Sequence, residues 1–252
     1  MLTVTELLLR SYRLYRKHVW TLLGYAAWLL LPSAAFLALE FSRETYQDAV
    51  WFIPVVLLVA TSVIFLGLWL TIILTKLCAV IIDGKTLDLK TLQHASWMLI
   101  TPLLAVTFLQ TIIVTGGALL FIIPGLIFLV WYAFAQFALI LDGTRGLQSL
   151  SQSKQLVQGR FWIVTWKLVS GPIIITFIYT SILVALITTI GLATGAQIEP
   201  LFEEGAPLWV GILESIADMF VTPMMLMYFT LLYIELKNHP VTPPVENDKQ
   251  VA

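Results

Sequence analysis

Charged side chains are scarce in this chain. Asp, Glu, Lys and Arg make up 12% of its 252 residues, whereas about a quarter of the residues in soluble domains are charged. Residues 99–141 contain no charge at all, and residues 161–194 contain only Lys167. With 59% hydrophobic residues and a mean hydropathy of +0.92, the composition excludes a soluble domain and indicates a protein that folds in lipid.

Cysteine and histidine are also rare, and their scarcity excludes several kinds of site. Cys78 is the only cysteine, so the chain cannot form an internal disulfide. The three histidines, His18, His94 and His239, lie in separate segments, and we interpret them as solvated residues near the membrane surface. Because metal sites need clustered ligands, neither a metal nor a cofactor is expected.

Two kinds of intramembrane enzyme can be compared with the sequence. Glu203 and Glu204 are similar to the paired glutamates of prenyl-protein peptidases, but that pattern needs an arginine where Leu208 stands. A rhomboid-like serine protease needs a histidine within a span, and none of the three histidines lies in one. We therefore expect no catalytic residues and no enzymatic activity.

Long apolar runs predict the fold. Continuous runs of about 20 residues can cross a hydrocarbon core of roughly 30 Å as helices, and they lack the alternation of barrel strands. We expect an all-α integral membrane protein with six transmembrane helices, at about 19–39, 53–75, 98–118, 121–141, 168–190 and 215–236. Several runs exceed 30 residues, and we interpret their excess as interfacial helix. The polar, proline-rich tail, 238–252, is expected to be disordered in the cytoplasm.

The basic residues segregate to one side of this arrangement. Of the 14 Lys and Arg residues, only Arg43 falls in a segment that six spans place on the opposite side. By the positive-inside rule, both termini are predicted to be cytoplasmic, in a bacterial inner membrane. No segment has the dense basic face that binds phosphate backbones, which excludes nucleic acid as a partner. The loops on the opposite side are acidic and contain Glu40, Glu44, Asp48, Glu199, Glu203 and Glu204.

Three polar segments on the basic side precede spans. Residues 3–18 begin with a possible capping box of Thr3 and Glu6 and continue as an amphipathic helix that we place in the membrane interface. The alternative is a cytoplasmic extension of the first span. Residues 86–102 and 146–160 repeat the arrangement less cleanly, so we expect three helical hairpins with cytoplasmic interfacial helices. The apolar face of the first helix consists of Leu8, Tyr12, Tyr15 and Val19, and the Trp residues that lead into the hairpins are Trp20, Trp97 and Trp162.

One region carries a family resemblance. The stretch "IIPGLIFLVWYAFAQFALILDGTRGLQSLSQSKQLVQGRFW", residues 122–162, resembles a bacterial family of six-span membrane proteins of unknown function. That family includes the membrane domain that precedes the catalytic domain in some glycerophosphodiester phosphodiesterases. The resemblance implies a fold and no reaction, because the phosphodiesterase site belongs to a separate soluble barrel. The matching positions are Pro124, Gly125, Asp142, Gly143, Ser153, Lys154, Gly159, Phe161 and Trp162, and Lys154 departs from the more frequent arginine.

Glu214 and Asp218 are the candidate site residues of the last span. They lie one helical turn apart, and acids inside a membrane are candidates for function. Counting about 20 residues back from Glu235 places the outer boundary near Ile216, so we interpret both as interfacial acids. The alternative is that they line a cation or substrate path. Lys76 and Lys167 are interpreted as residues that snorkel to the headgroups.

These observations lead to two functional hypotheses. The first is a non-enzymatic inner-membrane protein that acts as a membrane module in envelope or lipid-related physiology. The alternative is a transporter or lipid-handling protein that binds its substrate between the hairpins. Membrane lipids are the expected partners, together with a protein partner or a second copy of the chain.

Overall fold

A computed structural model describes residues 1–46, 49–85, 96–195, 197–202 and 206–240. The expected fold class is confirmed, because the described residues form helices and no strands, and six helical stretches are long and apolar enough to cross a membrane. These six stretches are Val19–Leu39, Phe52–Asp83, Ile100–Leu120, Ile122–Asp142, Phe161–Thr194 and Leu208–Asn238. The predicted tail lies outside the described residues, apart from residues 238–240.

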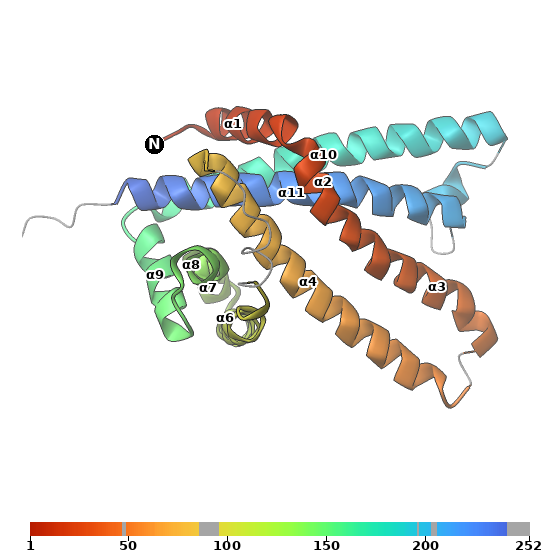
Figure 1. Cartoon of the computed structure of the whole chain (residues 1–252), viewed down its shortest axis with the longest axis horizontal. Helices are drawn as coiled ribbons and strands as arrows, with labels where there is room; N and C mark the ends of the chain where they lie inside the picture. The colour runs from red at the N-terminus through yellow and green to blue at the C-terminus, as the bar shows by residue number, and fades with distance from the viewer. Residues whose placement is uncertain (47–48, 86–95, 196, 203–205, 241–252) are drawn as a thin grey trace, which may run out of the picture.

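Figure 1 shows the helices in their order along the chain. The N-terminal part contains α1 (Val4–Lys17), α2 (Val19–Ala26), the 3-10 turn η1 (Ala27–Leu29), α3 (Leu30–Tyr46) and α4 (Phe52–Asp83). The middle part contains α6 (Ile100–Leu120), α7 (Ile122–Tyr132), α8 (Ala135–Asp142) and α9 (Leu147–Val157). The last part contains α10 (Phe161–Thr194), the turn η2 (Glu199–Phe202) and α11 (Leu208–Asn238).

Three helices are longer than one direct crossing requires. α4, α10 and α11 have 32, 34 and 31 residues, which corresponds to roughly 45–50 Å at about 1.5 Å per residue. From the sequence, we interpret their additional residues as interfacial helix that continues from the span. In the structure each continues without a break, and α4 and α10 end only where Gly84 and Gly195 adopt positive φ angles of 67° and 73°.

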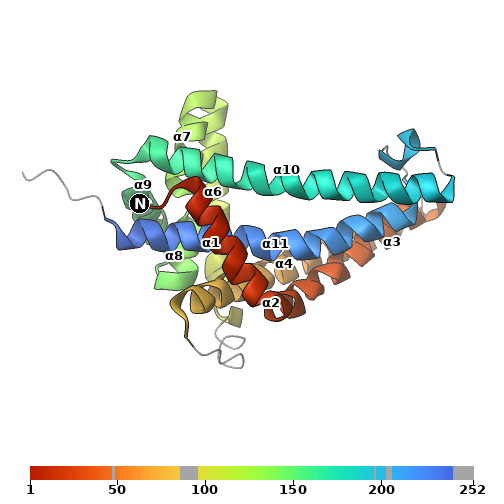
Figure 2. The same cartoon turned by 90° about the horizontal axis from the view of Figure 1, so that it is seen from above.

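The helices form three hairpins that point in different directions. α3 with α4, α6 with α7, and α10 with α11 make these pairs (Figures 1 and 2). The α6–α7 pair is seen end-on in Figure 1, where α10 and α11 lie lengthwise, and it crosses α10 and α11 in Figure 2. The hairpins come together near the N-terminus and the end of α11. We call the extended parts of the hairpins the arms.

α11 is the central helix. Half of the residues in its most apolar window are buried by other parts of the protein, compared with 11–33% for the other five spans. Its C-terminal half supplies the fully buried Tyr228, Leu232, Tyr233 and Leu236, which pack in one cluster with Leu7, Phe134 and Val164. This half of α11 is therefore apolar because it forms a protein core, whereas the arms expose their apolar side chains.

α1 packs against α11 and crosses it obliquely (Figure 2). The backbone N–H of Leu2 donates to the Glu235 carboxylate, and the Tyr15 hydroxyl donates to the Phe220 carbonyl at 3.1 Å, so the two helices run antiparallel. The predicted capping box is present between Thr3 and Glu6, and these hydrogen bonds lower the pKa of the Glu6 carboxyl. Leu7 and Ser11 face the protein and are fully buried, whereas Tyr12, on the face predicted to lie in the membrane interface, is half exposed. The first polar segment thus buries one face on a neighbouring helix.

The other two polar segments differ in how much of them is described. Residues 86–95, including His94, lie outside the described residues, so the second segment is described only from Ser96 onward. The third contains α9, which turns Ser149, Leu150, Ser153 and Val157 inward and leaves Ser151 exposed.

Candidate functional site

The buried polar groups of the protein gather where the hairpins meet. We call this cluster the joint and define it by the residues whose side chains make its contacts. They are Asp142, Gln152, Ser153, Arg160, Lys167, Tyr228, Tyr233, Glu235 and Lys237.

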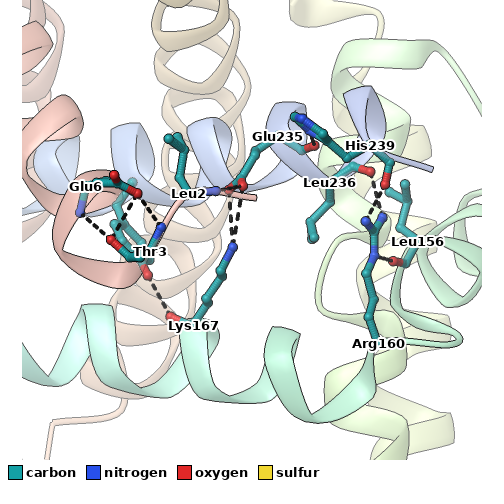
Figure 3. A network of polar contacts seen from close by, with 10 residues as sticks. Leu2, Thr3, Glu6, Leu156, Arg160, Lys167, Glu235, Leu236 and His239 are labelled. Carbon is teal, nitrogen blue, oxygen red and sulfur yellow. Dashed lines mark hydrogen bonds and ion pairs between the residues drawn. The ribbon is translucent and has the colours of Figure 1, made fainter. Parts of the chain in front are cut away.

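A buried ion pair connects α10 and α11 within the joint. The Lys167 ammonium lies 3.4 Å from a Glu235 carboxylate oxygen, and the two side chains are only 5% and 4% exposed (Figure 3). The Leu2 backbone N–H also donates to Glu235, and the Tyr228 hydroxyl donates to the Lys167 carbonyl at 2.7 Å. The prediction that Lys167 snorkels is wrong, because an acidic partner inside the protein neutralises it. Lys76, by contrast, is partly exposed.

Arg160 closes the C-terminal end of α11. Its guanidinium donates to the carbonyls of Leu236, at 2.6 Å, and His239, and its Nε donates to the Leu156 carbonyl at 2.7 Å (Figure 3). The last carbonyls of a helix have no partner within the helix and carry the negative end of its dipole, which a cation stabilises. Burial lowers the pKa of Arg160, and the charge of Glu235 opposes that shift.

Asp142 joins three helices on another side of the joint. Its carboxylate accepts hydrogen bonds from the Tyr233 hydroxyl and the Lys237 ammonium, both at 2.7 Å, and from the Gln152 amide. Asp142 ends α8, Gln152 lies on α9, and the other two lie on α11. With its side chain 12% exposed, Asp142 holds α9 and α11 against the end of the fourth span.

Ser153 repairs a break in the fourth span. α7 ends at Tyr132 and α8 begins at Ala135, which leaves backbone groups without partners in the helix. The Ser153 hydroxyl accepts from the Phe134 N–H at 3.0 Å and donates to the Trp131 carbonyl at 2.7 Å. Unpaired backbone groups are costly away from water, so this side chain stabilises the break. The next residue, Lys154, places its ammonium 4.4 Å from the centre of the Trp131 ring.

The remaining residues of the resembling stretch lie at turns and helix contacts. Gly143 and Gly159 adopt positive φ angles of 73° and 82° beside the joint. Pro124 stands in the first turn of α7, where a missing N–H breaks no helical bond, and Gly125 packs directly on α6. Phe161 packs against the core cluster of α11, and Trp162 is 80% exposed.

Glu214 and Asp218 lie away from the joint, on the N-terminal half of α11. Both side chains are exposed, and the Tyr179 hydroxyl of α10 donates to Asp218 at 2.9 Å. The structure therefore pairs Asp218 with the neighbouring helix, and it does not bring either acid to the joint.

The charged groups of the joint contact one another or the backbone of neighbouring helices. Its carboxylates already accept hydrogen bonds and its cations already have partners. Within the described part of the chain, no group of three or more His, Cys, Asp or Glu residues could hold a metal ion. Comparison with family models, curated proteins and solved structures finds no match to this chain.

The sequence reasoning missed the pairing of Lys167 with Glu235, although a signal for it exists. Lys167 is the only charge in the 34-residue α10, and Glu235 directly follows an uncharged run of α11, residues 219–234. A single charge in such a helix is expensive unless it is paired. Two such charges of opposite sign therefore indicate a contact between their helices.

Proposed function

We propose that the protein is a non-enzymatic membrane module of the bacterial inner membrane, with both termini in the cytoplasm, that serves envelope or lipid-related physiology. The observation that carries this proposal is the joint. Its charged and polar side chains are used to fasten α1, α8, α9, α10 and α11 to one another, and this is the chemistry of a scaffold.

The distribution of charge supports the orientation. The joint end carries the basic residues that the positive-inside rule assigns to the cytoplasm, including the exposed Arg10, Arg13 and Lys17 of α1. The arms carry large exposed apolar side chains such as Phe177, which is 72% exposed, and Leu58, which is 68% exposed. Such arms suit a hydrocarbon environment, where membrane lipids surround them, and they also offer surface to a protein partner or a second copy.

We also propose membership of the six-span family that the stretch 122–162 resembles. The residues that carry the resemblance make contacts that hold this fold together. Ser153 repairs the break in the fourth span, Asp142 ties α8 to α9 and α11, and Gly143 and Gly159 form the turns between helices. These contacts support the proposal, because they give the residues of the pattern a structural role in this chain.

The alternative, a transporter, would need Glu214 and Asp218 to face a substrate path. The hydrogen bond from Tyr179 to Asp218 and the exposure of Glu214 favour instead two acids on the surface of the α10–α11 arm.

Neutralisation of both acids tests the two functions against each other. A Glu214→Gln, Asp218→Asn variant should insert, fold and complement a deletion strain as the wild type does, because exposed charges shift stability by no more than about 0.5 kcal/mol. The measurement is growth under envelope stress, with the amount of inserted protein as the control. A correctly inserted variant that fails to complement would favour the transporter.

A further inference from the structure

The α6–α7 hairpin points in a direction of its own. In Figure 1 it is seen end-on, whereas α10 and α11 lie lengthwise and α3 and α4 run obliquely across the picture. In Figure 2, which is turned by 90°, the hairpin crosses α10 and α11. A hairpin that is end-on where another lies lengthwise makes a large angle with it, so the two cannot both take the short path across one membrane.

Charge indicates which hairpins cross. Arg160 precedes α10 and Lys237 lies near the end of α11, both at the joint, and Glu199 lies in η2 at the opposite end of this hairpin. The α3–α4 hairpin likewise has Glu40 and Glu44 near its tip. Charged residues are costly in hydrocarbon, so the tips of both hairpins must pass beyond it. The direction of these two hairpins therefore defines the direction across the membrane.

The tip of the α6–α7 hairpin is apolar and exposed. Residues 99–141, which include the whole hairpin, contain no charge. Five consecutive residues at the turn are 71–83% exposed, namely Leu119, Leu120, Phe121, Ile122 and Ile123. The protein does not cover these side chains, and water is an unfavourable neighbour for so many large apolar groups together. Hydrocarbon is the environment that suits this tip.

The backbone of the turn also suits hydrocarbon. A single residue, Phe121, separates α6 from α7. Its N–H donates to the Gly117 carbonyl at 3.0 Å, and its carbonyl accepts from the Gly125 N–H at 3.3 Å. Pro124 stands in the first turn of α7, where helices have N–H groups without partners, and it has no N–H to leave unpaired. Because open polar groups are costly in lipid, a turn with few of them can remain there.

One leaflet has room for this hairpin when it lies flat. Half of the hydrocarbon core measures about 15 Å, and a helix with its side chains is about 10–12 Å across, so a single layer of helices fits within one leaflet. α6 and α7 pack side by side and form such a layer. Asp142 ends the second leg of the hairpin and bonds to Tyr233 in the joint, which assigns the layer to the leaflet nearer the joint.

We propose that the α6–α7 hairpin does not cross the membrane but lies flat in the leaflet nearer the joint, where its exposed surface contacts the acyl chains of that leaflet alone. Of the six apolar stretches, four then cross, and both termini stay on one side of the membrane. The proposal rests on the membrane setting of the proposed module. It does not depend on the physiological role of the module or on which side the joint faces.

The depth of three positions along α6 tests the proposal. Leu104, Ile112 and Leu119 are 43%, 52% and 83% exposed. Leu104→Cys, Ile112→Cys and Leu119→Cys are made singly in a Cys78→Ala chain, spin-labelled and reconstituted in vesicles of equal parts dioleoyl phosphatidylglycerol and dioleoyl phosphatidylethanolamine. Electron paramagnetic resonance with oxygen and a nickel chelate as relaxation agents then gives the depth of each label below the nearest membrane surface.

A hairpin that lies flat places all three labels at the same depth. A hairpin that crosses places the label at position 112, the middle of α6, about 10 Å deeper than the other two, because they stand 8 and 7 positions away at roughly 1.5 Å per residue. We expect equal depths, with strong oxygen contact at all three positions.

α10 supplies the matched control. Val169, Phe177 and Val184 have the same spacing, are 47%, 72% and 41% exposed, and are centred on the middle of α10. Because α10 crosses the membrane, the label of Phe177→Cys should lie about 10 Å deeper than the labels of Val169→Cys and Val184→Cys.

Three results would overturn the proposal. A label at position 112 that is deeper than its neighbours on α6, as at position 177 on α10, would show that the hairpin crosses. Weak oxygen contact at all three α6 positions would show that protein, such as a second copy of the chain, covers this surface in place of lipid. Equal depths along α10 would remove the crossing hairpin with which α6–α7 is compared. Failure of the envelope complementation described above would leave all these depths unchanged.

Discussion

Ser153 shows how one hydroxyl can determine whether a broken span is stable. It accepts from the Phe134 N–H and donates to the Trp131 carbonyl, on the two sides of the gap between α7 and α8. The side chain is fully buried, so water cannot replace it. The contact of the neighbouring Lys154 is less specific. Its ammonium lies over the face of Trp131, and an arginine could make the same contact.

Ser153→Ala should therefore destabilise the protein. The substitution leaves a buried N–H without an acceptor, which costs about 1–3 kcal/mol. Ser170→Ala is the control, because the exposed Ser170 hydroxyl donates only to the carbonyl four residues earlier in its own helix, and its loss should cost less than about 0.5 kcal/mol. The measurement is the free energy of unfolding in mixed micelles; equal values for the two variants would contradict the role of Ser153.

For the buried ion pair of Lys167 and Glu235, removing one charge should destabilise the protein more than removing both. Lys167→Met leaves the Glu235 carboxylate buried without its cation, and this costs about 3–5 kcal/mol. Adding Glu235→Leu removes the second charge and should recover most of the loss. Recovery stays incomplete by about 1–3 kcal/mol, because the Leu2 N–H loses its acceptor.

The same unfolding measurement checks this prediction, with both single variants and the double variant compared. A Lys167→Met protein as stable as the wild type would mean that the pair is solvated. A double variant less stable than either single one would mean that the pair itself is strongly stabilising.

At the scale of elements, α6 and α7 depend on close approach of their backbones. A Cβ added at Gly125 would lie 2.7 Å from backbone atoms of Ala118, whereas one added at Gly116 meets nothing within 4 Å. Small residues allow such contacts in membranes, where packing rather than water drives helix association.

Gly125→Ala should accordingly separate α6 from α7. Overpacking of this kind costs about 1–3 kcal/mol, whereas Gly116→Ala should be neutral or stabilise its helix by up to about 1 kcal/mol. Thermal unfolding followed by circular dichroism in detergent distinguishes the two. Equal melting of both variants would show that the hairpin does not pack as described.

The sequence predicts the features of these helices that depend on local residues, and it does not predict those that depend on tertiary contacts. The length of apolar runs predicted the six spans, and the Thr3–Glu6 pattern predicted the cap of α1, because both signals are local. The burial of Leu7 and Ser11 of α1 within the protein was not predicted, because the sequence pattern assigned the apolar face of this helix to the membrane interface. A helix face shows which side chains are apolar and does not show whether lipid or protein covers them.

The sequence also did not show which apolar residues of the last span are covered by protein at the joint. Apolar residues suit lipid and protein neighbours equally well, so nothing in the last span distinguished its buried half, with Tyr228 and Tyr233, from its exposed half. The break after Tyr132 was also missed, because Ser153, which repairs it, lies 19 residues from Phe134 in a segment that looked interfacial. Only tertiary contacts give these residues their roles.

At the scale of the whole molecule, the protein has two different ends. At one end the joint fastens α1, α8, α9, α10 and α11 to one another, near the N-terminus (Figure 1). At the other end of α10 and α11 lies the turn η2 (Figure 2). The central claim is that these ends lie on opposite sides of one membrane, with the joint in the cytoplasm.

Site-directed labelling tests that claim most directly. In a Cys78→Ala background, Ser151→Cys places a thiol on the exposed face of α9 beside the joint, and Phe202→Cys places one in η2, where Phe202 is 51% exposed. A membrane-impermeant maleimide added to intact cells should label Cys at 202 and spare Cys at 151, which should react only in inside-out vesicles. Labelling of both positions from the same side would contradict the account.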